Sequence, residues 1–171
     1  IADNQVFISG WLYWHTVYWK IKMKKTIRGR SVPAIDTPLF RDIDYEASVN
    51  FERATNEGKF LELVGSRSFG KTVWQASYSG RIYTIVPKSQ VVVSAGNAGD
   101  IKTVTDMLEQ GLTNLHPALK KKRIKNNWKE EILAGFRNKS DGEISEKSSL
   151  SQILIKNYQN GNNSMAANGT K

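Results

Sequence analysis

The apolar positions of the chain change their spacing from segment to segment, and these changes predict the secondary structure. Apolar residues recur at helical spacing over 39–54, and glycine and polar residues end this helix. The short apolar run 60–64 then predicts a strand. Helical spacing returns over 71–86 and predicts a second helix, which Pro87 stops.

The next segments continue this alternation. The β-branched run 90–95 predicts a buried parallel strand, and the apolar stripe over 97–115 predicts a helix. A further strand is predicted over 150–155. The order strand, loop, helix, strand, helix is typical of an α/β fold with a parallel sheet flanked by helices, in which the loop 65–72 lies at the carboxyl edge of the sheet.

The N-terminal part differs from the rest in composition. Three of the five tryptophans fall in the aromatic segment 7–19, which we interpret as a packing element, with a base-stacking surface as the alternative. The basic stretch that follows, up to about residue 38, is interpreted as a loop. We therefore divide the chain into an aromatic and basic N-terminal segment, 1–38, and a partial domain, 39–171, that contains the predicted helices and strands.

The sequence GSRSFGKT at 65–72 matches the phosphate-loop pattern G-x-x-x-x-G-K-[ST]. Glycines let successive backbone N–H groups converge on an anion at a helix start. Lys71 is then placed for the β- and γ-phosphates and Thr72 for Mg²⁺, whereas the alternative is a glycine-rich turn with a chance lysine. The candidate nucleotide-binding residues are Gly65, Ser66, Arg67, Ser68, Phe69, Gly70, Lys71 and Thr72.

Composition narrows the remaining chemistry. Cysteine is absent, which excludes disulfides and thiol catalysis. The two histidines, His15 and His116, lie in dissimilar contexts, so we expect solvated or hydrogen-bonded structural roles rather than a metal site. No uninterrupted apolar segment has the length of a membrane span, so no membrane partner is expected.

The net charge of +9 is concentrated in two blocks. Lysines and arginines are dense over 20–30 and again over 120–129. Two such blocks are suited to a nucleic-acid backbone, although a charge run can also be only a solvated face. The candidate nucleic-acid residues are Lys120, Lys121, Lys122 and Arg123.

The sequence lacks the second half of a hydrolytic site. Nucleotide hydrolysis needs an acidic residue at the end of a second strand to organise Mg²⁺, and no apolar run here ends in Asp or Asp-Glu. We therefore expect this chain to bind nucleotide but to hydrolyse it poorly alone, with the domain continuing after Lys171.

The run GSRSFGKT, with arginine two places after the first glycine, is followed by VVVSAGN and a predicted helix. Together with the upstream segments WLYWHTVYW and PLFRDIDYE, it resembles the N-terminal ATPase domain of the large terminase subunit of tailed bacteriophages. The resemblance implies a P-loop NTPase fold of the additional-strand type, with ATP and Mg²⁺ as cofactors. It also implies a motor that drives dsDNA into a prohead.

The same resemblance implies roles for particular residues and partners. Lys71 and Arg67 would be catalytic, with Arg67 near the γ-phosphate, unless it only forms a salt bridge. The family's adenine-contacting segment falls near Phe40 and Arg41, where its glutamine is missing, and its acidic strand would come soon after Lys171. The implied partners are a portal protein, a small terminase subunit and further copies in a ring, in the host cytoplasm and transiently on the prohead.

Two other functions fit the residues. One is a different P-loop DNA motor, such as a helicase. The other is a noncatalytic basic DNA-binding or scaffold module in which the loop at 65–72 occurs by chance.

Overall fold

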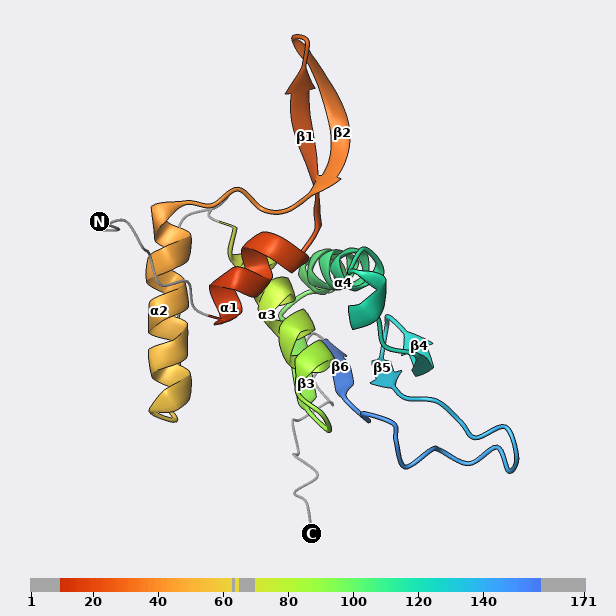
Figure 1. Ribbon diagram of the computed structural model, residues 1–171. Coiled ribbons are helices and arrows are strands. Elements are labelled where there is room, and N and C mark those ends of the chain that lie inside the picture. Colours follow the sequence, from red (N-terminus) through yellow and green to blue (C-terminus); the bar gives the residue numbers. More distant parts are fainter. Residues whose placement is uncertain (1–9, 63, 65–69, 158–171) are drawn as a thin grey trace, which may run out of the picture.

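The computed structural model describes residues 10–62, 64 and 70–157. It has a mixed α/β fold, with a four-stranded sheet, helices packed beside it and a separate two-stranded hairpin (Figure 1). The elements in chain order are α1 (Gly10–Tyr13), the π-helical turn η1 (Trp14–Tyr18), β1 (Ile21–Ile27), β2 (Arg30–Asp36), α2 (Asp42–Asn56), α3 (Lys71–Ile85), β3 (Gln90–Ala95), α4 (Ala98–Thr113), the 3₁₀ turn η2 (Pro117–Leu119), β4 (Arg123–Asn127), β5 (Glu131–Ala134) and β6 (Gln152–Asn157).

The four-stranded sheet is mixed rather than parallel. Its strand order is β3-β6-β5-β4, and only β3 and β6 pair in parallel, with Val91 opposite Ile153. The pairs β6–β5 and β5–β4 are antiparallel. The prediction of a parallel sheet is therefore confirmed for the β3–β6 pair and wrong for the other two pairs. The reason is that β4 and β5 form a hairpin, which the sequence pattern did not predict.

The three main helices and strand β3 follow the predicted pattern. The predicted helices over 39–54, 71–86 and 97–115 correspond to α2, α3 and α4, and the predicted strand 90–95 is β3. Helix α3 passes through Gly80 without interruption. These segments are long or strongly β-branched, so their local pattern decides their structure.

The predicted strand over 60–64 was wrong. Phe60, Leu61, Glu62 and Val64 lie in no strand, and the side chains of Phe60 and Val64 are exposed. An apolar run becomes a strand only when a neighbouring strand satisfies its backbone groups, and within the described residues β3 pairs with β6 alone. The candidate phosphate loop therefore follows a coil segment between α2 and α3.

The basic stretch at 20–38, predicted as a loop, contains the hairpin β1–β2. Its seven paired positions run from Ile21 opposite Asp36 to Ile27 opposite Arg30. The two residues at its turn, Arg28 and Gly29, both have positive φ, as the two-residue hairpin turn of type I′ requires. The alternation of apolar and polar residues over 21–24 is short, because Lys25 and Thr26 interrupt it.

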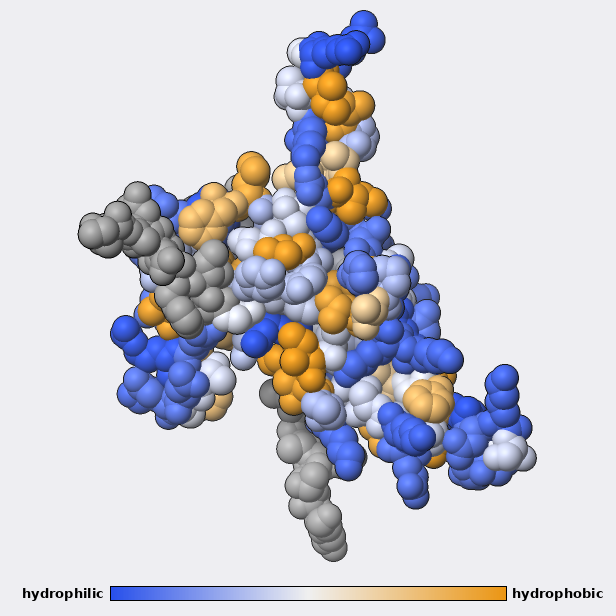
Figure 2. Space-filling model, viewed as in Figure 1, coloured by the Kyte–Doolittle hydropathy of each residue, from blue (hydrophilic) through white to orange (hydrophobic). Residues whose placement is uncertain are grey.

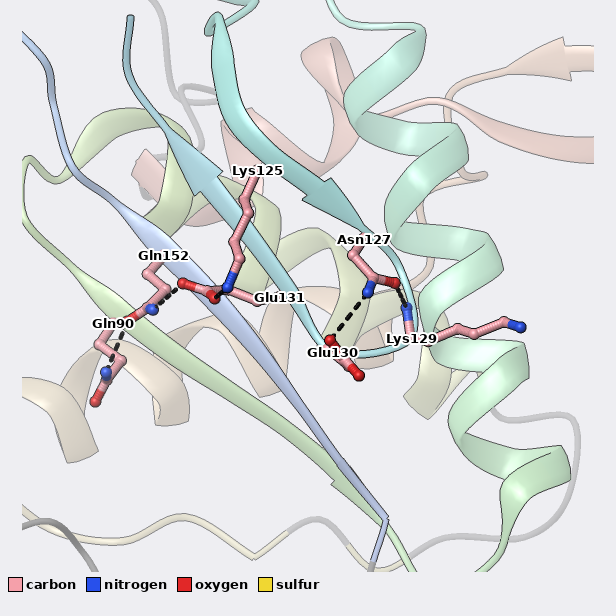
Figure 3. A network of polar contacts seen from close by, with 7 residues as sticks. All are labelled: Gln90, Lys125, Asn127, Lys129, Glu130, Glu131 and Gln152. Atoms are coloured by element: carbon pink, nitrogen blue, oxygen red, sulfur yellow. Dashed lines mark hydrogen bonds and ion pairs between the residues drawn. The ribbon is translucent and has the colours of Figure 1, made fainter. Parts of the chain in front are cut away.

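A row of polar side chains crosses the four-stranded sheet (Figure 3). Gln90 Nε2 donates to Gln152 Oε1 at 2.8 Å, and Gln152 in turn donates to Glu131, which also pairs with Lys125. The row joins β3, β6, β5 and β4 in that order. The Lys125 and Gln152 donors lower the pKa of the Glu131 carboxyl.

The core lies between the sheet and helices α3 and α4, and the N-terminal segment contributes to it. Trp14 and Trp19 are buried in the same cluster as Leu108, Ile132 and Ile153. Trp14 Nε1 donates to the Ser77 carbonyl at 3.1 Å, which fixes the segment against α3. The packing interpretation of the aromatic segment is confirmed for these tryptophans.

Trp11 is also buried, in a second cluster with Trp74. All three tryptophans of this segment are buried, so they offer no surface on which a base could stack. The alternative of a base-stacking surface was therefore wrong for these residues. None of the helices described in the structure is long and apolar enough to cross a membrane.

Candidate nucleotide site

The start of α3 carries the described part of the phosphate-loop motif. Gly70 is the N-cap and has φ 88°, in the left-handed region that favours glycine. Lys71 and Thr72 are the first two helical residues, and all three are half-buried. The first-turn N–H groups and the positive end of the helix dipole thus lie next to the motif's lysine and threonine.

Arg41, at the start of α2, lies against this glycine. A Cβ on Gly70 would lie 3.0 Å from Arg41 Nη2. The guanidinium is held by Asp44, with Nη2–Oδ1 at 2.8 Å and Nε–Oδ2 at 3.1 Å. This hydrogen-bonded pairing raises the pKa of Arg41.

Asp44 connects the starts of α2 and α3. Its side chain is 1% exposed and receives N–H donors from the Arg41 backbone at 2.9 Å and from Trp74 Nε1 at 2.8 Å, besides the guanidinium. A buried carboxylate is tolerated because these donors replace water. The same contacts fix Arg41 beside Gly70.

His15 lies behind this pair and is neutral at pH 7. Its ring stacks on Trp11 with centroids 5.5 Å apart, and the side chain is 1% exposed. Burial lowers its pKa from 6.5 to about 4, with Asp44 opposing this shift and Arg41 adding to it. Within the described part of the chain Nδ1 has no hydrogen-bond partner.

These groups surround a cavity of about 250 Å³ at the start of α3. Its walls are mostly apolar, and its polar contributions come from the side chains of His15 and Arg41 and from Gly70. Trp74 and Leu39 are among the residues that line it. The volume is below the roughly 300–1,000 Å³ of sites that enclose a whole ligand, so the cavity is suited to one ring of a larger molecule.

The structure brings only some of the predicted residues together. Gly70, Lys71 and Thr72 lie together, and Arg41, which the resemblance indicated, adjoins them. The remaining predicted positions lie outside the described residues: Gly65, Ser66, Arg67, Ser68 and Phe69.

The predicted nucleic-acid cluster lies at the other end of α3. Lys121 Nζ donates to the Tyr83 carbonyl at 2.9 Å and to Ser151 Oγ at 3.1 Å, and burial lowers its pKa. Tyr83 is twelve residues along the helix from Lys71, or about 18 Å. Lys121 thus has structural hydrogen bonds within the protein, away from the start of α3.

Arg123 is also engaged locally. It lies 5.4 Å from the centre of the Trp128 ring and donates to Asn126 at 2.8 Å. Lys120 and Lys122 remain exposed. Two of the four predicted residues therefore have roles inside the fold.

The chemistry available for a metal ion is limited. Thr72 supplies a hydroxyl at the position expected for a Mg²⁺ ligand. No group of three His, Asp or Glu side chains that could hold a metal occurs within residues 10–62, 64 and 70–157. The nearby Asp44 carboxylate already receives donors from Arg41 and Trp74, so ligating a metal would cost it these contacts.

The sequence did not predict that His15, Asp44 and Trp74 lie together beside the start of α3. His15 was expected to be solvated or hydrogen-bonded, but it is buried. The one available signal was the spacing from Arg41 to Asp44, which is that of a capping box at a helix start. His116, by contrast, has the expected structural role, since its Nδ1 accepts from Ala118 N at 3.3 Å.

The fold and the site define a mixed α/β protein with a glycine-capped helix start beside a small, mostly apolar cavity. No family model, curated protein or solved structure matches this chain.

Proposed function

We propose that this chain binds ATP at the start of α3, as the nucleotide-binding part of a dsDNA-packaging motor resembling the large terminase subunit. The observation that carries the proposal is the left-handed Gly70 followed directly by Lys71 and Thr72 in the first turn of a helix. A phosphate-loop motif requires this junction, because the helix start supplies N–H donors and the lysine supplies a positive charge.

The neighbouring cavity supports a nucleoside triphosphate over inorganic phosphate. With the phosphates at Lys71, an adenine ring would occupy the cavity that adjoins Gly70 and that His15 and Arg41 help to line. Neutral His15 and the mostly apolar walls of the cavity are suited to a neutral base. Mg²⁺, when bound with ATP, would neutralise phosphate charge beside Thr72.

An ATP titration of the parent chain and Lys71→Ala tests the proposal. Loss of a charge-assisted phosphate contact costs about 1.5–3 kcal/mol, so the dissociation constant should rise roughly ten- to hundredfold. Lys139→Ala, which removes an exposed lysine in a distant loop, is the matched control and should bind as the parent does. An absence of ATP binding by the parent, or equal binding by Lys71→Ala, contradicts the proposal.

Inorganic tripolyphosphate separates the phosphate contacts from the base contacts. Lys71→Ala should weaken both ligands, whereas His15→Gln, which changes the shape of the cavity wall, should weaken ATP by about three- to tenfold and leave tripolyphosphate unchanged. Equal effects of His15→Gln on both ligands would place the base elsewhere.

A further inference from the structure

The hairpin β1–β2 is an arm that stands away from the body of the molecule (Figure 1). Only its base is packed, where Ile21 reaches the main core, and every residue from 24 to 33 is exposed. Seven residues per strand give it a length of about 23 Å. A hairpin that buries so little of itself is poorly explained by a role in folding.

The arm is strongly basic. Residues 20–36 contain six basic side chains and one acidic side chain, which gives a net charge of +5. The single carboxylate, Asp36, lies at the base and pairs with Lys20 and Lys25. The other four cations have no ion pair within the described residues, and they are Lys22, Lys24, Arg28 and Arg30.

The tip carries a residue that the turn does not favour. Arg28 has φ 49°, in the left-handed region where Asn, Asp and Gly are preferred. Arginine therefore costs the turn some stability, and such outliers concentrate at functional sites. Arg28 is exposed in the turn that joins β1 to β2. The end of the arm is hydrophilic (Figure 2).

We propose that this arm is a duplex-DNA contact that inserts into the major groove. This inference rests on the proposed function, because it names the surface with which that motor would hold its DNA. The B-form major groove is about 12 Å wide and 8.5 Å deep, and it admits a two-stranded ribbon. The four unpaired cations then face phosphates on both groove walls.

The apolar side chains of the arm agree with a groove position. Ile27 and Val32 are exposed close to the tip, on the same face as Arg30. In the major groove, apolar side chains can contact the methyl groups of thymine. A protein partner is less suited to this surface, because the centres of protein interfaces are depleted in lysine.

The contact is tested by DNA binding as a function of salt, with a short labelled duplex. In the arm variant, Lys22, Lys24 and Arg30 become Gln and Arg28 becomes Asn. The control variant removes the same charge from the exposed Lys120, Lys122, Lys129 and Lys139. If the four cations contact phosphates, the slope of log K against log salt falls by about 3.6 in the arm variant, or about 0.9 per contact, and much less in the control.

Arg28→Asn alone separates function from folding. Asn suits the left-handed turn, so this change should leave the hairpin as stable as in the parent or more so, yet reduce the salt slope by about one. Arg28→Lys should retain the slope. A duplex RNA of the same length should bind more weakly, because its major groove is too narrow for the arm.

The outcomes separate this inference from the proposed function. Equal losses in the arm and control variants, or a loss only in the control, overturn the arm as the contact. Equal binding of duplex RNA overturns the groove position, and arm-dependent capture of an acidic protein without DNA binding overturns the choice of partner. ATP binding by the arm variant should equal that of the parent, so a failure of the nucleotide site appears in the ATP titration alone.

Discussion

His15 shows how a single buried side chain couples stability to pH. Its pKa in the folded protein is about 4, whereas an unfolded chain has the ordinary value of 6.5. Between these values the unfolded state binds the extra proton, so the free energy of unfolding falls as the pH drops from 6.5 towards 4. The total loss is about 3 kcal/mol.

Urea unfolding between pH 4 and pH 7 measures this effect. The parent should lose stability over that window, and His15→Gln, which cannot be protonated, should lose about 3 kcal/mol less. Parallel pH profiles for the two proteins would contradict the assignment of this effect to His15.

Gly70 makes a second prediction for a single residue. Gly70→Ala places a Cβ in the left-handed region, at a cost of about 1–2 kcal/mol, and presses on an arginine that Asp44 holds in place. Displacing that guanidinium weakens its hydrogen bonds and adds about 0.5–1.5 kcal/mol. Gly58→Ala is the matched control, since Gly58 has φ 61° and nothing within 4 Å of the new Cβ.

Urea midpoints of the two variants give the comparison. Gly70→Ala should be the less stable of the two. Equal stability of the two variants would show that the contact between the new Cβ and Arg41 does not change the free energy of unfolding.

The motif predicted only part of the candidate site. Lys71 and Thr72 follow from local pattern, because the loop and the helix start are contiguous in sequence. His15 and Asp44 lie far from Gly70 along the chain and approach the start of α3 only through the packing of α2 and η1 against α3. No local spacing in the sequence predicts contacts between residues so far apart, so the sequence did not predict the cavity.

At the scale of elements, α3 and α4 are joined by one indole ring. A Cβ added to Gly80 would lie 2.3 Å from the Trp19 ring, and one added to Gly111 would lie 2.1 Å from it. Both helices therefore need glycine where Trp19 enters between them. This requirement reverses the usual preference for alanine inside a helix.

Gly111→Ala tests this wedge. Alanine normally stabilises a helix interior by about 0.5–1 kcal/mol relative to glycine, but here overpacking against Trp19 should destabilise the protein by about 1–3 kcal/mol. Thermal or urea unfolding measures the change. Gly96→Ala, where the new Cβ meets nothing within 4 Å, should be nearly neutral.

A second variant tests whether the loss of stability in Gly111→Ala comes from the Trp19 ring. Trp19→Phe removes ring atoms that the new methyl group would meet, so the double variant should be more stable than the sum of the two single changes. Additive losses would show that the strain lies elsewhere.

At the scale of the whole molecule, sequence pattern predicted helices better than the sheet. Helix α4 carries its own apolar stripe, and β3 is a run of β-branched residues. The described residues of the apolar segment 60–64, which are 60–62 and 64, lie in no strand, whereas the lysine-rich β1 is a strand. Strand formation depends on a partner elsewhere in the chain, which local composition does not reveal.

The parallel pairing of β3 with β6 sets the order in which the protein acquires structure during synthesis. The arm β1–β2 pairs neighbours and can close soon after it leaves the ribosome. β3 must wait until α4, β4 and β5 have been made before β6 arrives beside it. Throughout that interval the nascent chain exposes the apolar face of α4 and the edge of β3, and a chaperone that shields them should raise the yield of folded protein.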